Sequence, residues 1–287
     1  MKVNAPVTPL QRERAAALGG AARLRVGRDK GTEPRRFGVI SCYGTPMRTV
    51  QAGKLKVRAL GGSDGSGGGD GPALLLCHGY GAPGDDLVSL SRAIDAGPGV
   101  RWFFPEAPLA IDVGMGTPGR AWWNIDMMAI QRAMMSGGRR DFSTSETPAG
   151  MTEARSALAE CVDSLIKEQA VDPARLVVGG FSQGAMITTD LAVTRAHPYA
   201  GLVILSGALV DGARWKSALE RSGKDLRVLQ SHGRQDPLLP FDVAESLRNL
   251  LVASGATVEW SPFNGQHEIP MAVLDRIGPF ARARFGT

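Results

Sequence analysis

The sequence predicts an α/β fold with a mainly parallel central sheet and helices on both of its faces. Short runs of aliphatic and β-branched residues alternate with longer stretches of helical periodicity through most of the chain. This alternation is typical of strand–helix–strand units, which build parallel sheets. The composition agrees, because a chain of 287 residues that is 43% hydrophobic is large enough to bury a substantial core.

The expected elements follow one another in strand-then-helix order. We expect strands over residues 55–60, 73–77, 100–104, 175–180, 201–206, 226–231 and 256–260. We expect helices over residues 86–95, 151–169, 184–196, 241–254 and 270–283. Seven glycines within residues 61–71 predict a flexible loop between the first two strands. Residues 109–150, rich in Met and Trp, interrupt the alternation and are expected to form an insertion over the sheet.

Residues 1–50 are expected to be a basic, partly irregular N-terminal extension. They carry ten Lys and Arg side chains against three acidic ones. Such a segment could bind peripherally to an anionic lipid surface, and this possibility stays open. A nucleic-acid partner is not expected, because no aromatic residue interleaves with the arginines before Phe37.

The composition also indicates the cellular compartment of the protein. No apolar run approaches the roughly 20 residues that a membrane-spanning helix needs, and residues 1–30 lack the apolar core of a secretory signal. The three cysteines are scattered without Cys-x-x-Cys spacing, so neither a disulfide framework nor a zinc site is expected. A cytoplasmic protein is therefore expected, while its oligomeric state, including a homodimer, stays open.

The sequence Gly-Phe-Ser-Gln-Gly at residues 180–184 is the most informative motif. It directly follows a predicted strand and directly precedes a predicted helix, as a Gly-x-Ser-x-Gly nucleophile elbow requires. The same pattern occurs at residues 61–65, where no helix follows, and is discarded. Ser182 is therefore the predicted nucleophile, and an ordinary helix-capping serine is the structural alternative.

A serine hydroxyl needs a base to take its proton and an acid to orient that base. On this scaffold the partners follow the serine in the order acid, then histidine. Asp236 and His267 satisfy that order, and both follow predicted strands. His232 is expected to bond within the loop that presents Asp236. Glu268 is the competing acid, but neighbours on the chain rarely let their side chains face one another.

Several motifs in this order resemble the phospholipase/carboxylesterase family, which includes the acyl-protein thioesterases. They lie at residues 77–81, 104–108, 121–126, 180–185, 205–207, 232–236 and 265–267. The resemblance spans residues 73–280 and implies an α/β-hydrolase fold that cleaves carboxylic esters or thioesters without a metal or other cofactor. We expect the catalytic domain to cover residues 51–287. The resemblance also implies the triad Ser182, Asp236 and His267, and an oxyanion hole formed by the backbone N–H groups of Tyr80 and Gln183.

The substrate side of the site is expected within residues 109–150. Trp122, Trp123, Met127 and Met128 are the candidate substrate-binding residues, and a helix over residues 125–135 would be apolar nearly all round. Flexible methionines can line an adaptable acyl site or a lid. Alternatively, this helix is buried and Trp122 fills the core. Under the first interpretation the substrate is a small-molecule or lipid-like ester with an apolar acyl group.

Other functions are also compatible with parts of this sequence. A peptidase, lactonase or polyester hydrolase would use the same triad, and a non-catalytic ligand-binding protein could share the scaffold. Gly79-x-Gly81-x-x-Gly84 also matches a dinucleotide-binding fingerprint. However, Asp85 and Asp86 stand where a pyrophosphate would lie and would repel it. The sequence therefore favours a loop that turns the Tyr80 N–H toward Ser182, and no nicotinamide or flavin cofactor is expected.

Overall fold

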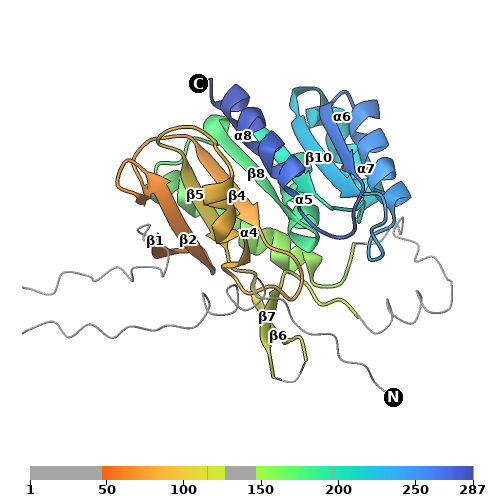
Figure 1. Ribbon diagram of the computed structural model, residues 1–287, viewed down its shortest axis with the longest axis horizontal. Helices are drawn as coiled ribbons and strands as arrows, with labels where there is room; N and C mark the ends of the chain where they lie inside the picture. Colours follow the sequence, from red (N-terminus) through yellow and green to blue (C-terminus); the bar gives the residue numbers. More distant parts are fainter. Residues whose placement is uncertain (1–46, 115, 127–146, 195–196, 287) are drawn as a thin grey trace, which may run out of the picture. The chain divides into compact units, whose positions relative to one another are not determined.

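The computed structural model describes residues 47–114, 116–126, 147–194 and 197–286 (Figure 1). All of them belong to one unit of the chain, Gly38–Thr287. Nearly all of the predicted basic extension lies outside the described residues. The same is true of Met127, Met128 and most of the helix expected over residues 125–135.

The described elements alternate between strands and helices for most of the chain. The strands are β1 (Met47–Ala52), β2 (Leu55–Gly62), β3 (Ser66–Gly68), β4 (Ala73–Cys77), β5 (Arg101–Pro105), β6 (Leu109–Asp112), β7 (Pro118–Ala121), β8 (Leu176–Phe181), β9 (Gly201–Leu205), β10 (Arg227–Gly233) and β11 (Thr257–Phe263). The helices are α2 (Leu90–Ala93), α4 (Met151–Glu168), α5 (Gln183–Thr194), α6 (Gly212–Ser222), α7 (Phe241–Ala253) and α8 (Met271–Phe285). Three 3₁₀ turns complete them: η1 (Asp86–Ser89), η2 (Pro173–Arg175) and η3 (Gly223–Asp225).

The main sheet is mixed, with its parallel part at the centre and on one side. Its strand order is β1-β2-β5-β4-β8-β9-β10-β11, and β3 pairs with β2. The pairs β1–β2 and β2–β5 are antiparallel. From β5 onward, every neighbouring pair along this order is parallel. The antiparallel hairpin β6–β7 projects from this body (Figure 1).

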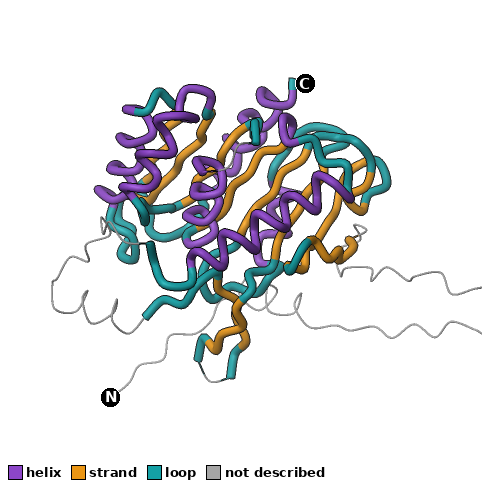
Figure 2. Tube along the Cα trace, turned by 180° about the vertical axis from the view of Figure 1, so that it is seen from behind, coloured by secondary structure: helices purple, strands orange, loops and turns teal. Residues whose placement is uncertain are grey.

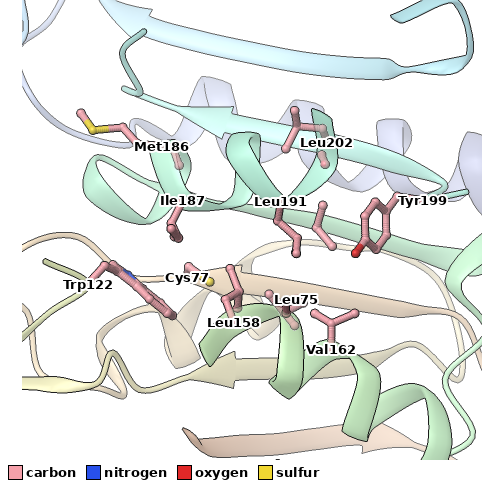
Figure 3. Packing of buried hydrophobic residues seen from close by; sticks show 14 of the residues in the cluster. Leu75, Cys77, Trp122, Leu158, Val162, Met186, Ile187, Leu191, Tyr199 and Leu202 are labelled. Carbon is pink, nitrogen blue, oxygen red and sulfur yellow. The ribbon is translucent and has the colours of Figure 1, made fainter. Parts of the chain in front are cut away.

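Helices cover both faces of the sheet, and Figures 1 and 2 view the two faces in turn. Successive residues of β4 point to opposite faces, so Leu75 and Leu74 belong to different hydrophobic clusters. The Leu75 cluster is closed by α4 and α5 (Figure 3), and by α6 and α7. The Leu74 cluster is closed by α8 and η1. Because both faces are covered, the central strands are buried along their whole length, as continuous apolar runs predict.

This architecture confirms the predicted α/β fold, while some elements differ from the expectation. The sequence did not indicate β1, α6 or the hairpin β6–β7. The glycine-rich residues 61–71 were wrongly expected to be a flexible loop. They contain β3, and the buried Arg101 side chain donates a 2.9 Å hydrogen bond to the Gly67 carbonyl. A partner far along the chain therefore orders a segment whose composition alone favours flexibility.

The strand order places a crevice beside β4. The chain continues from β4 to β5 on one side, whereas β8 and the strands after it lie on the other side. Loops that leave β4 and β8 therefore diverge at the carboxyl edge of the sheet, where open α/β sheets bind their ligands. Among the described helices, none has both the length and the apolar character that crossing a bilayer requires.

Candidate active site

Ser182 lies at the sharp turn between β8 and α5. Its backbone adopts φ = 54°, in the left-handed region that L residues rarely occupy. A Cβ atom built on Gly184 would lie 2.0 Å from the Cys77 carbonyl oxygen, and one on Gly180 would lie 2.5 Å from the same atom. Only glycine at these two positions lets the elbow pack directly on β4. The turn therefore presents Ser182, half-buried, at the edge of the sheet.

Asp236 and His267 face each other across the loops that follow β10 and β11. The His267 Nδ1 atom lies 2.7 Å from Asp236 Oδ2. The other carboxylate oxygen, Oδ1, accepts hydrogen bonds of 2.9 Å from the backbone N–H groups of Leu238 and Leu239. The carboxylate is thus held by its own loop and oriented toward one imidazole nitrogen. Its contact leaves the other nitrogen of His267 for a further partner.

The Asp236 side chain is fully buried and remains ionised. Burial by itself raises the pKa of this carboxyl group. The hydrogen bonds from His267 and from the Leu239 N–H, together with the charges of the two nearby histidines, outweigh burial and hold the pKa below its ordinary value. A permanent negative charge therefore lies beside His267, where it stabilises an imidazolium.

His232 is fully buried beneath this pair and does not reach the serine loop. Its Nε2 atom lies 2.8 Å from the Leu239 carbonyl oxygen and 3.3 Å from Asp236 Oδ2. The ring therefore binds within the loop that presents Asp236, as the sequence predicts. Glu268 turns away from His267 and accepts a 3.1 Å hydrogen bond from the Gln266 N–H.

Ser182 and His267 line one cavity of about 170 Å³. The large apolar side chains of its wall are Ile125, Phe181, Leu238 and Leu239, and Gly79, Tyr80, Ala82 and Asp86 complete the wall. No motif marks these four apolar residues in the sequence, although Phe181 lies inside the elbow motif and the two leucines directly follow Asp236-Pro237. A wider, more open cavity on the far side of His267 includes Gln235, Gln266 and Glu268.

The loop after β4 packs directly on the serine elbow. A Cβ atom on Gly79 would lie 3.3 Å from the Ser182 Cβ. Within the described part of the chain, neither the Tyr80 N–H nor the Gln183 N–H donates to a backbone carbonyl. Gln183 begins α5, so its N–H belongs to the positive end of a helix. Two backbone donors are thus available on either side of Ser182.

Trp122 and Trp123 do not line this cavity. Their side chains are buried, and Trp122 packs against the core beside Cys77 and Leu158 (Figure 3). The burial departs from the predicted substrate contact and agrees with the alternative in which Trp122 fills the core. The indole N–H of Trp122 donates a 3.0 Å hydrogen bond to the His78 carbonyl oxygen.

The dinucleotide alternative finds no support in the loop that follows β4. Glu106 follows β5, roughly where a dinucleotide-binding fold would place the acid that binds the ribose. Here its carboxylate is paired with Arg120 at 3.0 Å and with Arg58 at 3.3 Å. The Glu106 side chain also fills the space beside Gly84, where an added Cβ would lie 2.4 Å from its Cγ. The described residues contain no group of His, Cys, Asp and Glu arranged to hold a metal ion.

Comparison with known proteins agrees with the predicted resemblance. A family model described as Phospholipase/Carboxylesterase matches residues 69–283. Acyl-protein thioesterase 1 of Kluyveromyces lactis is 30% identical over 176 residues, which make up 58% of this chain and 71% of that protein. Acyl-protein thioesterase 1 of Mycosarcoma maydis is 26% identical over 205 residues, or 66% of this chain and 81% of that protein.

Solved structures share the fold. Esterase PE8 superposes with a TM-score of 0.66 at 24% identity, covering 80% of this chain and 99% of that one. Acyl-protein thioesterase 2 of Zea mays superposes with a TM-score of 0.59 at 21% identity, covering 80% and 99%. These likenesses show that the sheet and its helices form an α/β-hydrolase fold, which confirms the fold that the sequence resemblance implies.

Proposed function

Because this chain belongs to the phospholipase/carboxylesterase family and is a serine hydrolase of the ester and thioester type, we propose that Ser182, His267 and Asp236 are its catalytic triad. The observation that carries the proposal is the 2.7 Å contact between His267 and Asp236 beside a cavity that Ser182 also lines. The order of the three residues along the chain is the one that this scaffold uses.

The reaction begins with acyl transfer to the serine. Ser182 Oγ adds to the acyl carbonyl carbon while His267 takes its proton, and the carbonyl π electrons move to the oxygen. The backbone N–H groups of Tyr80 and Gln183 stabilise that oxyanion, which is usually the largest electrostatic contribution to such catalysis. His267 then gives its proton to the departing alcohol or thiol, leaving an acyl-enzyme.

Hydrolysis of the acyl-enzyme repeats these steps with water as the nucleophile. His267 takes a proton from the water, the same two N–H groups stabilise the second oxyanion, and Ser182 leaves as the protonated hydroxyl. Asp236 stays ionised throughout and holds His267 in the tautomer whose second nitrogen is a free base.

The acyl group that this site accepts is apolar. Four apolar side chains, Ile125, Phe181, Leu238 and Leu239, form much of the cavity wall next to Ser182. Asp86 is the acidic residue of the same wall and would oppose a carboxylate on the acyl group. The substrate class proposed here is an uncharged or lipid-like acyl ester or thioester.

A series of p-nitrophenyl esters of increasing acyl length tests both parts of the proposal. Ser182→Ala should abolish turnover of every ester and labelling by a fluorophosphonate probe, whereas the wild type should react with both. Full activity in Ser182→Ala would show that another nucleophile does the chemistry. Equal turnover of apolar esters and of esters with a carboxylate-bearing acyl group would contradict the apolar acyl site alone.

A further inference from the structure

A short segment that begins in the last residues of β7 contacts both sides of the proposed oxyanion hole. We call residues Arg120–Trp123 the bridging segment. On one side it contacts the loop that carries Tyr80, and on the other it contacts the side chain of Gln183. Neither contact takes part in the chemistry described above.

The first side is held by backbone pairing and by one indole. The Gly81 N–H donates to the Arg120 carbonyl at 2.9 Å, and the Arg120 N–H donates to the Ala82 carbonyl at 3.0 Å. The indole N–H of Trp122 donates to the His78 carbonyl at 3.0 Å. Tyr80 therefore lies between two points at which its loop is fastened to the bridging segment.

The second side is held by the amide of Gln183, which is only 1% exposed. Its Oε1 atom accepts a 2.9 Å hydrogen bond from the Trp122 N–H, and its Nε2 donates a 2.8 Å hydrogen bond to the Trp123 carbonyl. Both ends of this side chain are thus satisfied by one stretch of backbone. A buried amide without these partners would be costly, so the pairing is strongly favoured.

His78, whose carbonyl accepts the indole hydrogen bond, has both of its ring nitrogens in hydrogen bonds of its own. His78 is 2% exposed, and its Nδ1 atom lies 2.8 Å from the Gly79 carbonyl oxygen. Its Nε2 accepts a 3.1 Å hydrogen bond from the Ala107 N–H, which fixes the neutral tautomer with the proton on Nδ1. A Cβ atom on Gly119 would lie 2.5 Å from the Gly81 carbonyl oxygen, so the two backbones approach as closely as glycine allows.

We propose that the bridging segment sets the position of the two oxyanion-hole donors relative to each other, with the side chains of Gln183 and Trp122 as positioning groups. Gln183 then has two separate functions, since its backbone N–H faces the substrate oxygen while its side chain holds the opposite loop at the correct distance. Trp122, predicted as a substrate contact, acts instead from the core. This inference rests on the proposed function.

How well an oxyanion hole stabilises the developing charge depends on where its donors lie, and not only on how many there are. The donors must lie about 2.7–3.1 Å from the position that the oxyanion will occupy. Tyr80 and Gln183 come from loops after different strands, so nothing along the chain fixes their separation. A displacement of about 1 Å at such a site can cost roughly 100-fold in rate.

Two variants test the inference. Gln183→Met keeps the length of the side chain and loses both hydrogen bonds, and Trp122→Phe loses the indole N–H. Each should lower kcat/KM for a p-nitrophenyl ester by about 10- to 100-fold. The matched control is Thr189→Val, which removes a buried 2.7 Å hydrogen bond within the same helix, α5, and does not touch the bridging segment.

A pair of inhibitors separates positioning from general damage. Ser182 Oγ adds to the carbonyl carbon of a trifluoromethyl ketone, and the hydroxyl proton of Ser182 goes to His267. The carbonyl π electrons move to the ketone oxygen, which becomes an oxyanion. The matching trifluoromethyl carbinol cannot form this adduct. Ketone affinity should fall in Gln183→Met by the same factor as kcat/KM, while carbinol affinity and the acid limb of the pH profile stay as in the wild type.

Unchanged ketone affinity in Gln183→Met would overturn the inference, and so would an equal loss of ketone and carbinol affinity. If Trp122→Phe does not fold, the outcome for Gln183→Met decides. Ser182→Ala distinguishes the two levels of the argument. If Ser182→Ala remains active, the proposed function fails; if it is inactive while Gln183→Met equals the wild type, only the positioning inference fails.

Discussion

Asp236 and His267 meet through a single 2.7 Å contact, while the second oxygen of the carboxylate is held by two backbone N–H groups of its own loop. In the proposed triad, these contacts suit Asp236 to orient His267 rather than to accept its proton. One oxygen anchors the side chain and the other selects the tautomer of His267. The two oxygens therefore respond differently to substitution, which can be tested.

Replacement of Asp236 by Asn should keep the loop and lose the activity. The amide oxygen can still accept from the N–H groups of Leu238 and Leu239, so its NH₂ group is turned toward His267. That group donates to Nδ1 and leaves the proton of the imidazole on Nε2, where it blocks the base. We expect kcat to fall by about 10⁴-fold with an unchanged far-UV circular dichroism spectrum.

Glu268→Gln is the matched control for this prediction. Glu268 Oε1 accepts from the Gln266 N–H at 3.1 Å, and a glutamine can make the same hydrogen bond. Activity should therefore stay close to that of the wild type. A loss in Glu268→Gln as large as that in Asp236→Asn would transfer the orienting role to Glu268.

Two buried neutral histidines should make the fold less stable in mild acid. Burial lowers the pKa of both His78 and His232 below the ordinary value of 6.5. Below pH 6.5 the unfolded chain binds protons that the folded chain still refuses, so the free energy of unfolding decreases as the pH falls. The slope should be up to about 1.4 kcal/mol per pH unit for each histidine, measured by urea unfolding between pH 7.5 and pH 5.

The lowered pKa of Asp236 acts in a different range. That carboxylate stabilises the fold above its ordinary value of 3.8, and this contribution disappears only as the pH falls through the lower pKa of the folded state. The change between pH 7.5 and pH 5 therefore belongs to the histidines. His232→Gln should reduce the slope of the free energy of unfolding against pH by up to about 1.4 kcal/mol per pH unit, which corresponds to one proton. This reduction is expected whatever the substitution does to stability at pH 7.5. A slope identical to that of the wild type would contradict this assignment.

The elbow glycines should not tolerate even a methyl group. In Gly184→Ala the new Cβ would lie 2.0 Å from the Cys77 carbonyl oxygen and 2.5 Å from that of His78. Backbone atoms cannot move aside as a flexible side chain can. We expect the free energy of unfolding to fall by about 3 kcal/mol or more, as measured by urea titration.

Gly212→Ala is the matched control. It begins α6, and an added Cβ would meet the Leu209 side chain at 3.5 Å, which is ordinary van der Waals contact. Because alanine favours helix more than glycine does, this variant should be neutral or more stable by up to about 1 kcal/mol. Equal effects at the two positions would show that the close approach of the elbow to β4 is not what requires glycine.

The sequence alone leads to the three residues of the proposed triad, because the proposed chemistry requires them to follow strands. The parallel strands β8, β10 and β11 end at the same edge, so their loops meet there without any knowledge of side-chain packing. The positioning role proposed for the Gln183 side chain does not follow from the sequence, because the elbow motif treats that side chain as a variable position. The two hydrogen bonds that support the proposal join it to backbone groups of Trp122 and Trp123, which no residue pattern marks.

Long-range partners explain the other differences. Composition predicted a flexible glycine-rich loop, yet Arg101 lies fully buried beside it and holds the Gly67 carbonyl. Composition likewise suggested a substrate surface at Trp122, whose only polar atom in the ring is satisfied by His78 within the core. In both cases a hydrogen bond joins a side chain to a backbone carbonyl far away in the chain, and the local sequence does not indicate such a partner.

A buried ion pair joins α4 to α5, and removing one of its charges should destabilise the fold far more than removing one charge of the exposed pair that α4 makes with Lys54. Asp190 is fully buried, and its carboxylate accepts from the Arg155 guanidinium and from the Trp215 indole N–H at 2.8 Å. In Asp190→Asn the indole keeps an acceptor, whereas Arg155 loses the nearest opposite charge. The free energy of unfolding should fall by about 3 kcal/mol.

On the same helix, Glu160 pairs with Lys54 at 3.2 Å, and those side chains are 46% and 73% exposed. Glu160→Gln should therefore cost less than about 1 kcal/mol. Urea unfolding of the two variants side by side checks the difference, and similar losses would mean that burial of Asp190 does not strengthen its pairing with Arg155.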